Sequence, residues 1–195
     1  GINIVAVLLE AYSFGHPTGN DSLLAELSIS GISTYPVITA VFVNYPKTDY
    51  GADIQNWSIT QSDDGTMYFA NNEGLLSYNG SRWNLYPHPD GLIVRAVAAG
   101  HDQRIYAGSF EDLGYWDHDE YGNMDYHSLK GLVTGFNFHN QEVWRILVTG
   151  DSVWFQSFSV VFLLHENQVT VVNPPGMITS FSQVRDGLVA RIGGR

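Results

Sequence analysis

The chain has 195 residues, of which 44% are hydrophobic, 13% are aromatic and only 15% are charged, and this balance excludes a disordered chain. Its formal net charge of -11, from 20 acidic and 9 basic residues, excludes a nucleic-acid partner or an anionic membrane surface for this segment. The absence of cysteine excludes disulfides, thiolate metal sites and a cysteine nucleophile.

The N-terminal stretch at residues 2–14 (INIVAVLLEAYSF) is apolar except for Asn3, Glu10 and Ser13. It is similar to the hydrophobic region of a secretory signal, but no basic residue precedes it and Glu10 interrupts it. It is too short to span a bilayer, so a buried strand or short helix is the alternative. We assign residues 1–35 to an N-terminal extension, either signal-like or covering another surface.

From residue 56 onward, four apolar runs recur in a fixed order. The second run is MYFAN at 67–71, IYAGS at 105–109 and VWFQS at 153–157, and LVARI at 188–192 begins a fourth copy. Asp/Gly turns separate the first run from the second in every unit, which is a hairpin signal. Four strands per unit, repeated at roughly 35 to 48 residues, are typical of propeller blades.

The sequence therefore predicts an all-β fold for residues 36–195, a partial β-propeller truncated at its C-terminus. It should contain three four-stranded antiparallel blades and half of a fourth. Residues 36–44 (PVITAVFVN) have strand composition and would pair with the last blade in a closed ring.

An open arc of this kind leaves the outer faces of its end blades uncovered. We expect Tyr68 and Phe69 in the first blade and Val189 and Ile192 in the last to be exposed there. We therefore predict that the chain self-associates into a dimer or larger assembly, and coverage of an open face by residues 2–14 is the alternative.

Alignment of the repeats superposes Trp57, Arg95 and Trp144 at the start of the first strand, and Arg145 follows directly. In a propeller this strand lines the central channel, and ligands commonly bind at the channel mouth. Two indoles and a guanidinium suit sugar recognition, so these four residues are the candidate ligand-binding site. The alternative is that they pack between adjacent blades, because tryptophan is usually buried.

No catalytic residues or cofactor are predicted for this segment. His118 with Asp117 and Asp119 could bind a metal, but the stretch DHDEYG falls where the repeat places the turn between third and fourth strands. We therefore interpret it as a solvated turn and predict no metal site.

Four pieces of the chain carry a resemblance to a known family. They are NYPKTDYGADIQNW at 44–57, MYFANNEGLLSYNG at 67–80, RIYAGSFEDLGYW at 104–116 and EVWRILVTGDSVWFQSF at 142–158. Together they resemble the two-component regulator propellers, the sensors of hybrid two-component systems and of related helix-turn-helix regulators in polysaccharide-degrading gut bacteria. The resemblance implies a periplasmic sensor in a membrane-anchored parent, which carries an immunoglobulin-like domain and a histidine kinase or helix-turn-helix output.

Three functions remain open at this stage. The first is a propeller that senses an oligosaccharide in the periplasm for a signal-transduction regulator. The second is a protein-interaction or dimerisation scaffold, and the third is a propeller glycosidase or lyase. The first two functions involve no catalysis, and we expect no enzymatic activity in this segment.

Overall fold

The computed structural model describes residues 4–11, 38–185 and 187–193, which form two compact units that divide between Tyr50 and Gly51. In the first unit, β1 (Ile4–Ala11) and β2 (Ile38–Tyr45) pair antiparallel, and α1 (Lys47–Tyr50) follows.

The two strands of the first unit test the expectations for the N-terminal region. The strand expected at 36–44 is confirmed from Ile38 onward, and the strand alternative for 2–14 is confirmed over residues 4–11. Here β2 pairs with β1, and its pairing with the last blade of a closed ring stays a prediction. Most of the predicted extension lies outside the described residues, and the domain boundary at 35/36 stays a prediction.

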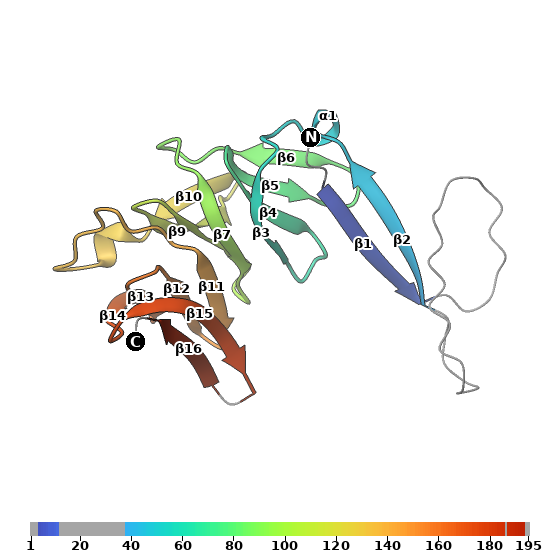
Figure 1. The fold of residues 1–195 in the computed structure, drawn as a ribbon. Helices are drawn as coiled ribbons and strands as arrows, with labels where there is room; N and C mark the ends of the chain where they lie inside the picture. Colours follow the sequence, from blue (N-terminus) through green and yellow to red (C-terminus); the bar gives the residue numbers. More distant parts are fainter. Residues whose placement is uncertain (1–3, 12–37, 186, 194–195) are drawn as a thin grey trace, which may run out of the picture. The chain divides into compact units, whose positions relative to one another are not determined.

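The second unit contains three four-stranded antiparallel sheets and one hairpin, each built from consecutive strands (Figure 1). This confirms the predicted three blades and half of a fourth. Within the described residues, helix is limited to α1 and the 3-10 turn η1 (Lys130–Leu132). The strands are, for the first blade, β3 (Asn56–Gln61), β4 (Met67–Asn71), β5 (Gly74–Tyr78) and β6 (Trp83–Tyr86); for the second, β7 (Val94–Ala99), β8 (Ile105–Ser109), β9 (Leu113–His118) and β10 (Met124–Ser128); for the third, β11 (Arg145–Thr149), β12 (Ser152–Gln156), β13 (Val161–His165) and β14 (Gln168–Val172); and for the half-blade, β15 (Met177–Val184) and β16 (Gly187–Gly193).

The hairpin turns form because short acidic side chains bond to their own backbone. In the β9–β10 turn, Asp119 accepts hydrogen bonds from the backbone N–H groups of Tyr121 (2.8 Å) and Asn123 (2.7 Å). Donation from the Asn123 side chain and backbone lowers the pKa of Asp119. The expected turn is therefore confirmed over residues 119–122 of DHDEYG, while Asp117 and His118 end β9.

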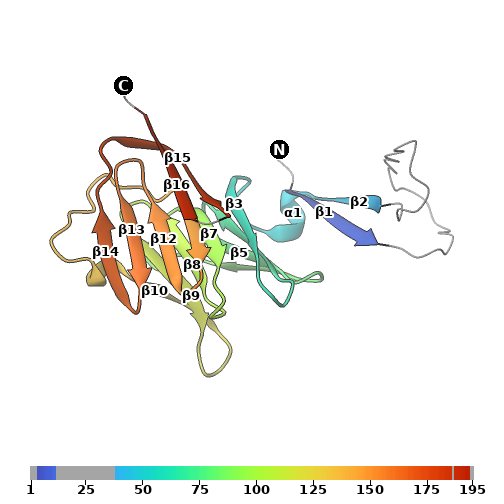
Figure 2. The ribbon, with the colours of Figure 1, turned by 90° about the horizontal axis from the view of Figure 1, so that it is seen from below.

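Equivalent second-strand residues fill the spaces between blades. Tyr68 lies in a buried cluster with Val97 and Ile105 of the second blade. Tyr106 packs edge-on against Phe155 of the third blade, with ring centroids 6.0 Å apart. The rings of Trp154 and Phe181 of the half-blade have centroids 6.5 Å apart. Figure 2 shows β15 beside the third blade. The core of the second unit is thus a series of apolar layers between successive sheets.

The prediction of exposed apolar side chains is confirmed at the last blade and wrong at the first. Val189 and Ile192 are 51% and 37% exposed, as expected for the last blade. The expectation for the first blade was wrong, because Tyr68 and Phe69 are only 7% and 4% exposed. Tyr68 is covered by the second blade, and the Phe69 ring lies 5.5 Å from that of Trp83.

Candidate ligand-binding site

The candidate residues occupy irregular positions in the innermost strands. The register shifts between Asn56 and Ser58 in β3, which places Trp57 in a bulge, and between Val94 and Ala96 in β7, which does the same for Arg95. A β-bulge leaves one residue unpaired in the ladder and redirects its side chain.

The third blade follows the same pattern just before β11. The backbone N–H of Trp144 donates to the carbonyl of Gln156 (2.9 Å), the residue that also lies opposite Arg145. Trp144 therefore lies at the start of the third blade's first strand, in the position equivalent to Trp57 and Arg95 that the repeat alignment predicted.

A close backbone approach brings Trp144 towards the second blade. The N–H of Val143 donates to the carbonyl of Ser109 (3.1 Å). A Cβ added to Gly108 would lie only 2.3 Å from Cγ1 of Val143, so only glycine lets the two segments meet. The start of the third blade is thereby fixed beside β8 and β7.

The structure brings Trp57, Arg95 and Trp144 together. Cζ of Arg95 lies 3.9 Å from the ring centroid of Trp57 and 5.2 Å from that of Trp144. The two indoles are 6.0 Å apart and meet edge to face at 76°. Cation–π attraction and aromatic packing thus join three consecutive blades at one end of their inner strands.

Two polar partners of this cluster were missed by sequence reasoning. Nε of Arg95 donates to Oε1 of Glu142 at 2.5 Å, and Nε1 of Trp57 donates to Oδ1 of Asn72 at 2.8 Å. Asn72 in turn donates to Oδ2 of Asp53 at 2.8 Å. The Arg95 side chain is 16% exposed and its charge is matched by Glu142.

The cluster has an exposed aromatic edge and two unsatisfied donors. Trp57 is 41% exposed, and Phe158, which is 50% exposed, lies 5.4 Å from the Trp144 ring. Among the described residues, Nη1 of Arg95 and Nε1 of Trp144 are buried without an acceptor. Buried donors of this kind cost free energy, so an added acceptor oxygen would stabilise the site.

Arg145, the fourth predicted residue, is the exposed first residue of β11. None of the hydrogen bonds, ion pairs or ring contacts of the described residues joins it to the other three. It lies next to the cluster in sequence without being part of it.

A second polar cluster lies between the first and second blades and is buried. Asp112 accepts hydrogen bonds from Tyr126 (2.9 Å) and Ser128 (2.6 Å), and its Oδ2 lies 3.3 Å from Nε2 of His88. Burial raises the pKa of Asp112, but the hydrogen bonds from His88, Ser128 and Tyr126 outweigh it and leave that pKa below its ordinary value.

The tautomer of His88 follows from its other ring nitrogen. The backbone N–H of Asp90 donates to Nδ1 at 3.2 Å, so the neutral ring carries its proton on Nε2, facing Asp112. The His88 side chain has no exposed surface. The pair therefore joins the two blades and is not accessible to a substrate in this structure.

No helix among the described residues is long and apolar enough to cross a membrane. The described residues also hold no group of three side chains suited to a metal ion.

Comparison with known proteins shows similarity at the level of structure. No family model and no curated protein matches the sequence. The extracellular domain of BT4673 from B. thetaiotaomicron, described as a hybrid two-component system, is 17% identical with a TM-score of 0.57, over 70% of this chain and 19% of that one. The corresponding domain of BT3049 is 15% identical with a TM-score of 0.55, over 77% and 21%.

Virginiamycin B lyase from Staphylococcus aureus is similar in fold as well. It is 15% identical with a TM-score of 0.58, over 76% of this chain and 52% of the lyase. This chain thus spans about a fifth of the sensor chains and about half of the lyase. Sensor domains of the kind expected from the sequence are among its structural neighbours, and what these neighbours establish is the propeller fold.

Proposed function

We propose that this chain is the ligand-binding part of a sensor propeller in a bacterial signal-transduction regulator, and that it senses an oligosaccharide in the periplasm. The observation that carries the proposal is the cluster of Trp57, Arg95 and Trp144. Three blades contribute one side chain each to the same end of the inner strands. A recognition site needs side chains from several blades to converge, whereas packing within one blade does not require such convergence.

The chemistry of the cluster suits a sugar. The exposed indole of Trp57 can cover the apolar face of a pyranose ring. Arg95 and Trp144 each hold a buried donor without an acceptor, and such donors can bond to the ring or hydroxyl oxygens of a sugar. The Glu142 carboxylate already matches the charge of Arg95, which favours a neutral oxygen over a second carboxylate.

Two of the structural neighbours support a sensor outside the cytoplasm. The two sensor structures are extracellular domains of proteins described as hybrid two-component systems. A periplasmic location and a membrane-anchored parent with a kinase or helix-turn-helix output follow by analogy with them and with the sequence resemblance.

Calorimetric titration of the 195-residue chain tests the proposal. The panel contains neutral cello-, xylo-, arabino- and galacto-oligosaccharides and acidic oligogalacturonides. We expect at least one neutral member to bind, and Arg95→Ala to lose on the order of 1.5–3 kcal/mol of binding free energy, as for hydrogen bonds that involve a charged group.

Arg95→Lys and Tyr121→Ala are the matched variants. Lysine keeps the charge but not the planar fork, so it should bind weakly. Tyr121 is 81% exposed in the β9–β10 turn, and its variant should bind like the wild type. Failure of every sugar to bind, or equal affinity of the wild type and Arg95→Ala, would remove this site.

A dimerisation scaffold is the second candidate, because the half-blade exposes apolar side chains. Met177, Val184 and Val189 are 59%, 49% and 51% exposed. Patches of this kind often mark protein interfaces. Concentration-dependent dimerisation without sugar binding would favour this function.

A lyase is the third candidate, on the strength of the shared fold with virginiamycin B lyase. Elimination from an acidic sugar creates a conjugated double bond, which absorbs ultraviolet light. Incubation of the chain with oligogalacturonides should give no such absorbance if the sensor proposal holds. A steady rise that depends on protein concentration would favour the lyase.

A further inference from the structure

The loop between β8 and β9 connects the candidate site to a second part of the same surface. Phe110 forms an isolated antiparallel bridge with Glu142, the residue that binds Arg95. Next to it, the N–H of Glu111 donates to the carbonyl of Gln141 at 2.7 Å. These bonds form a short ladder that runs outward from the Trp57, Arg95 and Trp144 cluster.

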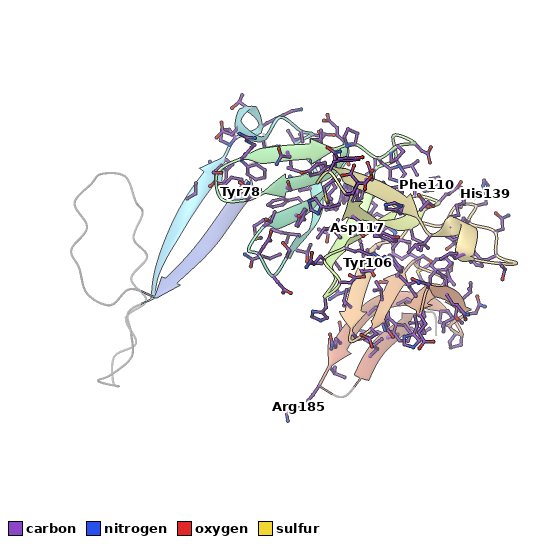
Figure 3. The ribbon with its side chains drawn as sticks, turned by 180° about the vertical axis from the view of Figure 1, so that it is seen from behind. Tyr78, Tyr106, Phe110, Asp117, His139 and Arg185 are labelled. Atoms are coloured by element: carbon purple, nitrogen blue, oxygen red, sulfur yellow. The ribbon has the colours of Figure 1, made fainter. Side chains whose placement is uncertain are left out.

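Two hollows lie next to this ladder, and Glu111 and Lys130 line both of them. We call the one that Phe110 lines the inner hollow and the other the outer hollow. The inner hollow has a volume of about 340 Å³ and includes the half-exposed ring of Phe110. The outer hollow, of about 350 Å³, is lined by Phe138 and His139 among others. Figure 3 shows Phe110 and His139 in the same region of the second unit. Each volume falls at the lower end of the range for small-molecule sites.

The wall of the outer hollow is held in place by specific contacts. Oε1 of Glu111 accepts the backbone N–H of Asn140 at 2.8 Å and lies 3.2 Å from Nδ1 of His139. Nζ of Lys130 lies 5.5 Å from the Phe138 ring centroid. The hollow is therefore formed before any ligand arrives, which lowers the entropic cost of binding.

The charges around the inner hollow select against an anion. Asp90 and Glu111 contribute two carboxylates, and Lys130 contributes one ammonium group. Asp112 also lines the hollow, but its carboxylate is buried and accepts from Tyr126 and Ser128. The exposed face of Phe110 offers apolar area beside these polar groups. A neutral molecule with many hydroxyls and an apolar ring face fits this combination, whereas a polyanion does not.

We propose that the two hollows are outer subsites for an extended neutral oligosaccharide, one end of which lies on Trp57, Arg95 and Trp144. This inference rests on the proposed function and names its ligand class, a chain of several neutral sugar units. Phe110 stacks on a sugar in the inner subsite. Lys130, which lines both hollows, donates to hydroxyls at the junction of the two subsites.

The experiment compares oligosaccharides of different length. The wild-type chain is titrated by calorimetry with the disaccharide, tetrasaccharide and hexasaccharide of each neutral series, and with hexameric oligogalacturonide. The variants Phe110→Ala, Lys130→Ala and Trp57→Ala are titrated with the disaccharide and hexasaccharide, and Tyr121→Ala is the control. Circular dichroism melting of each variant checks its fold.

We expect the affinity to rise tenfold or more from disaccharide to hexasaccharide, and the acidic hexamer to bind at least tenfold more weakly. Phe110→Ala and Lys130→Ala should each weaken hexasaccharide binding five- to twentyfold and leave disaccharide binding unchanged. Trp57→Ala should weaken both.

The outcomes separate this inference from the proposed function. Affinity that does not depend on length, or hexasaccharide binding that Phe110→Ala and Lys130→Ala both leave unchanged, overturns the outer subsites while the site at Trp57 stands. Tighter binding of the acidic hexamer overturns the neutral ligand class. Absence of binding by every sugar overturns both proposals.

Discussion

Tyr106 in the second blade and Val189 in the half-blade occupy the same position of the repeat, yet their surroundings differ completely. Tyr106 is 4% exposed beneath the third blade, whereas Val189 is 51% exposed. Each lies near the start of the second strand of its blade, Tyr106 in β8 and Val189 in β16.

The difference shows that the repeat determines which face is apolar, while the neighbouring blade determines whether that face is buried. Tyr68, Tyr106 and Trp154 each pack against a following blade. Val189 has no such blade among the described residues. The stabilising free energy of this position therefore comes from the interface between blades, as in other repeat proteins.

The largest effect is expected when the buried member of the pair is truncated. Tyr106→Ala should lower the free energy of unfolding by about 3–5 kcal/mol, because it leaves a large cavity between the second and third blades. Val189→Ala should change it by less than about 0.5 kcal/mol. Urea unfolding followed by fluorescence measures both. Comparable losses in the two variants would mean that Val189 is covered in solution.

The interface between the first and second blades contains a polar cluster in addition to its apolar layer. Asp112→Asn should lower the free energy of unfolding at neutral pH by about 1–3 kcal/mol, because donors from Tyr126 and Ser128 lose a charged acceptor. Since the folded pKa of Asp112 is below its ordinary value of 3.8, the stability that it adds is present above pH 3.8 and is lost below it.

Acid titration separates this role from simple packing. The wild type should lose stability as the pH falls through the folded pKa of Asp112, and the asparagine variant should lose less over that range. If the free energy of unfolding falls equally with pH in the two proteins, the acid sensitivity arises from other carboxylates. Ser81→Ala, in the exposed β5–β6 turn, is the control.

The hydroxyl of Tyr106 should contribute less to the free energy of unfolding than Asp112 does, and its contribution should be lost at high pH instead of low pH. Burial, followed by the hydrogen bond to Asp102, raises the pKa of Tyr106 from 10.0 to about 12. The neutral phenol is therefore favoured by folding, so its contribution is full below pH 10 and is lost as the pH rises towards 12. Tyr106→Phe should cost about 1 kcal/mol at neutral pH.

Alkaline unfolding monitors the same hydroxyl directly. The difference in stability between wild type and Tyr106→Phe should shrink between pH 10 and 12 and should be constant below that range. A difference that is unchanged at high pH would show that folding does not raise the pKa of Tyr106.

The smallest change in stability is expected on the open face, where association is the informative quantity. Val189→Ser should leave the free energy of unfolding within about 0.5 kcal/mol of the wild type. We expect the wild type to self-associate through its exposed apolar face and the variant to do so more weakly. Sedimentation equilibrium at micromolar concentration compares them, and identical association constants would place the contact elsewhere.

Local sequence was sufficient for the strands and the blades. Alternating apolar residues and Asp/Gly turns act over a few residues, so the four-run repeat predicted the three blades and the half-blade. The same repeat placed Trp57, Arg95 and Trp144 in equivalent positions at the start of the inner strand, where the register shifts at Trp57 and Arg95. It could not exclude Arg145, because the sequence alone does not show that the side chains of two adjacent residues point in different directions.

Only the tertiary structure decided the contacts between blades. Arg95 and Glu142 are 47 residues apart, and their ion pair exists because Gly108 lets the start of the third blade approach β8. The burial of Tyr68 and Phe69, which the sequence assigned to an open face, likewise depends on which neighbour covers each side of the sheet. The physical reason is that strand periodicity and turn chemistry are properties of adjacent residues, whereas burial and charge pairing arise from packing between separate sheets.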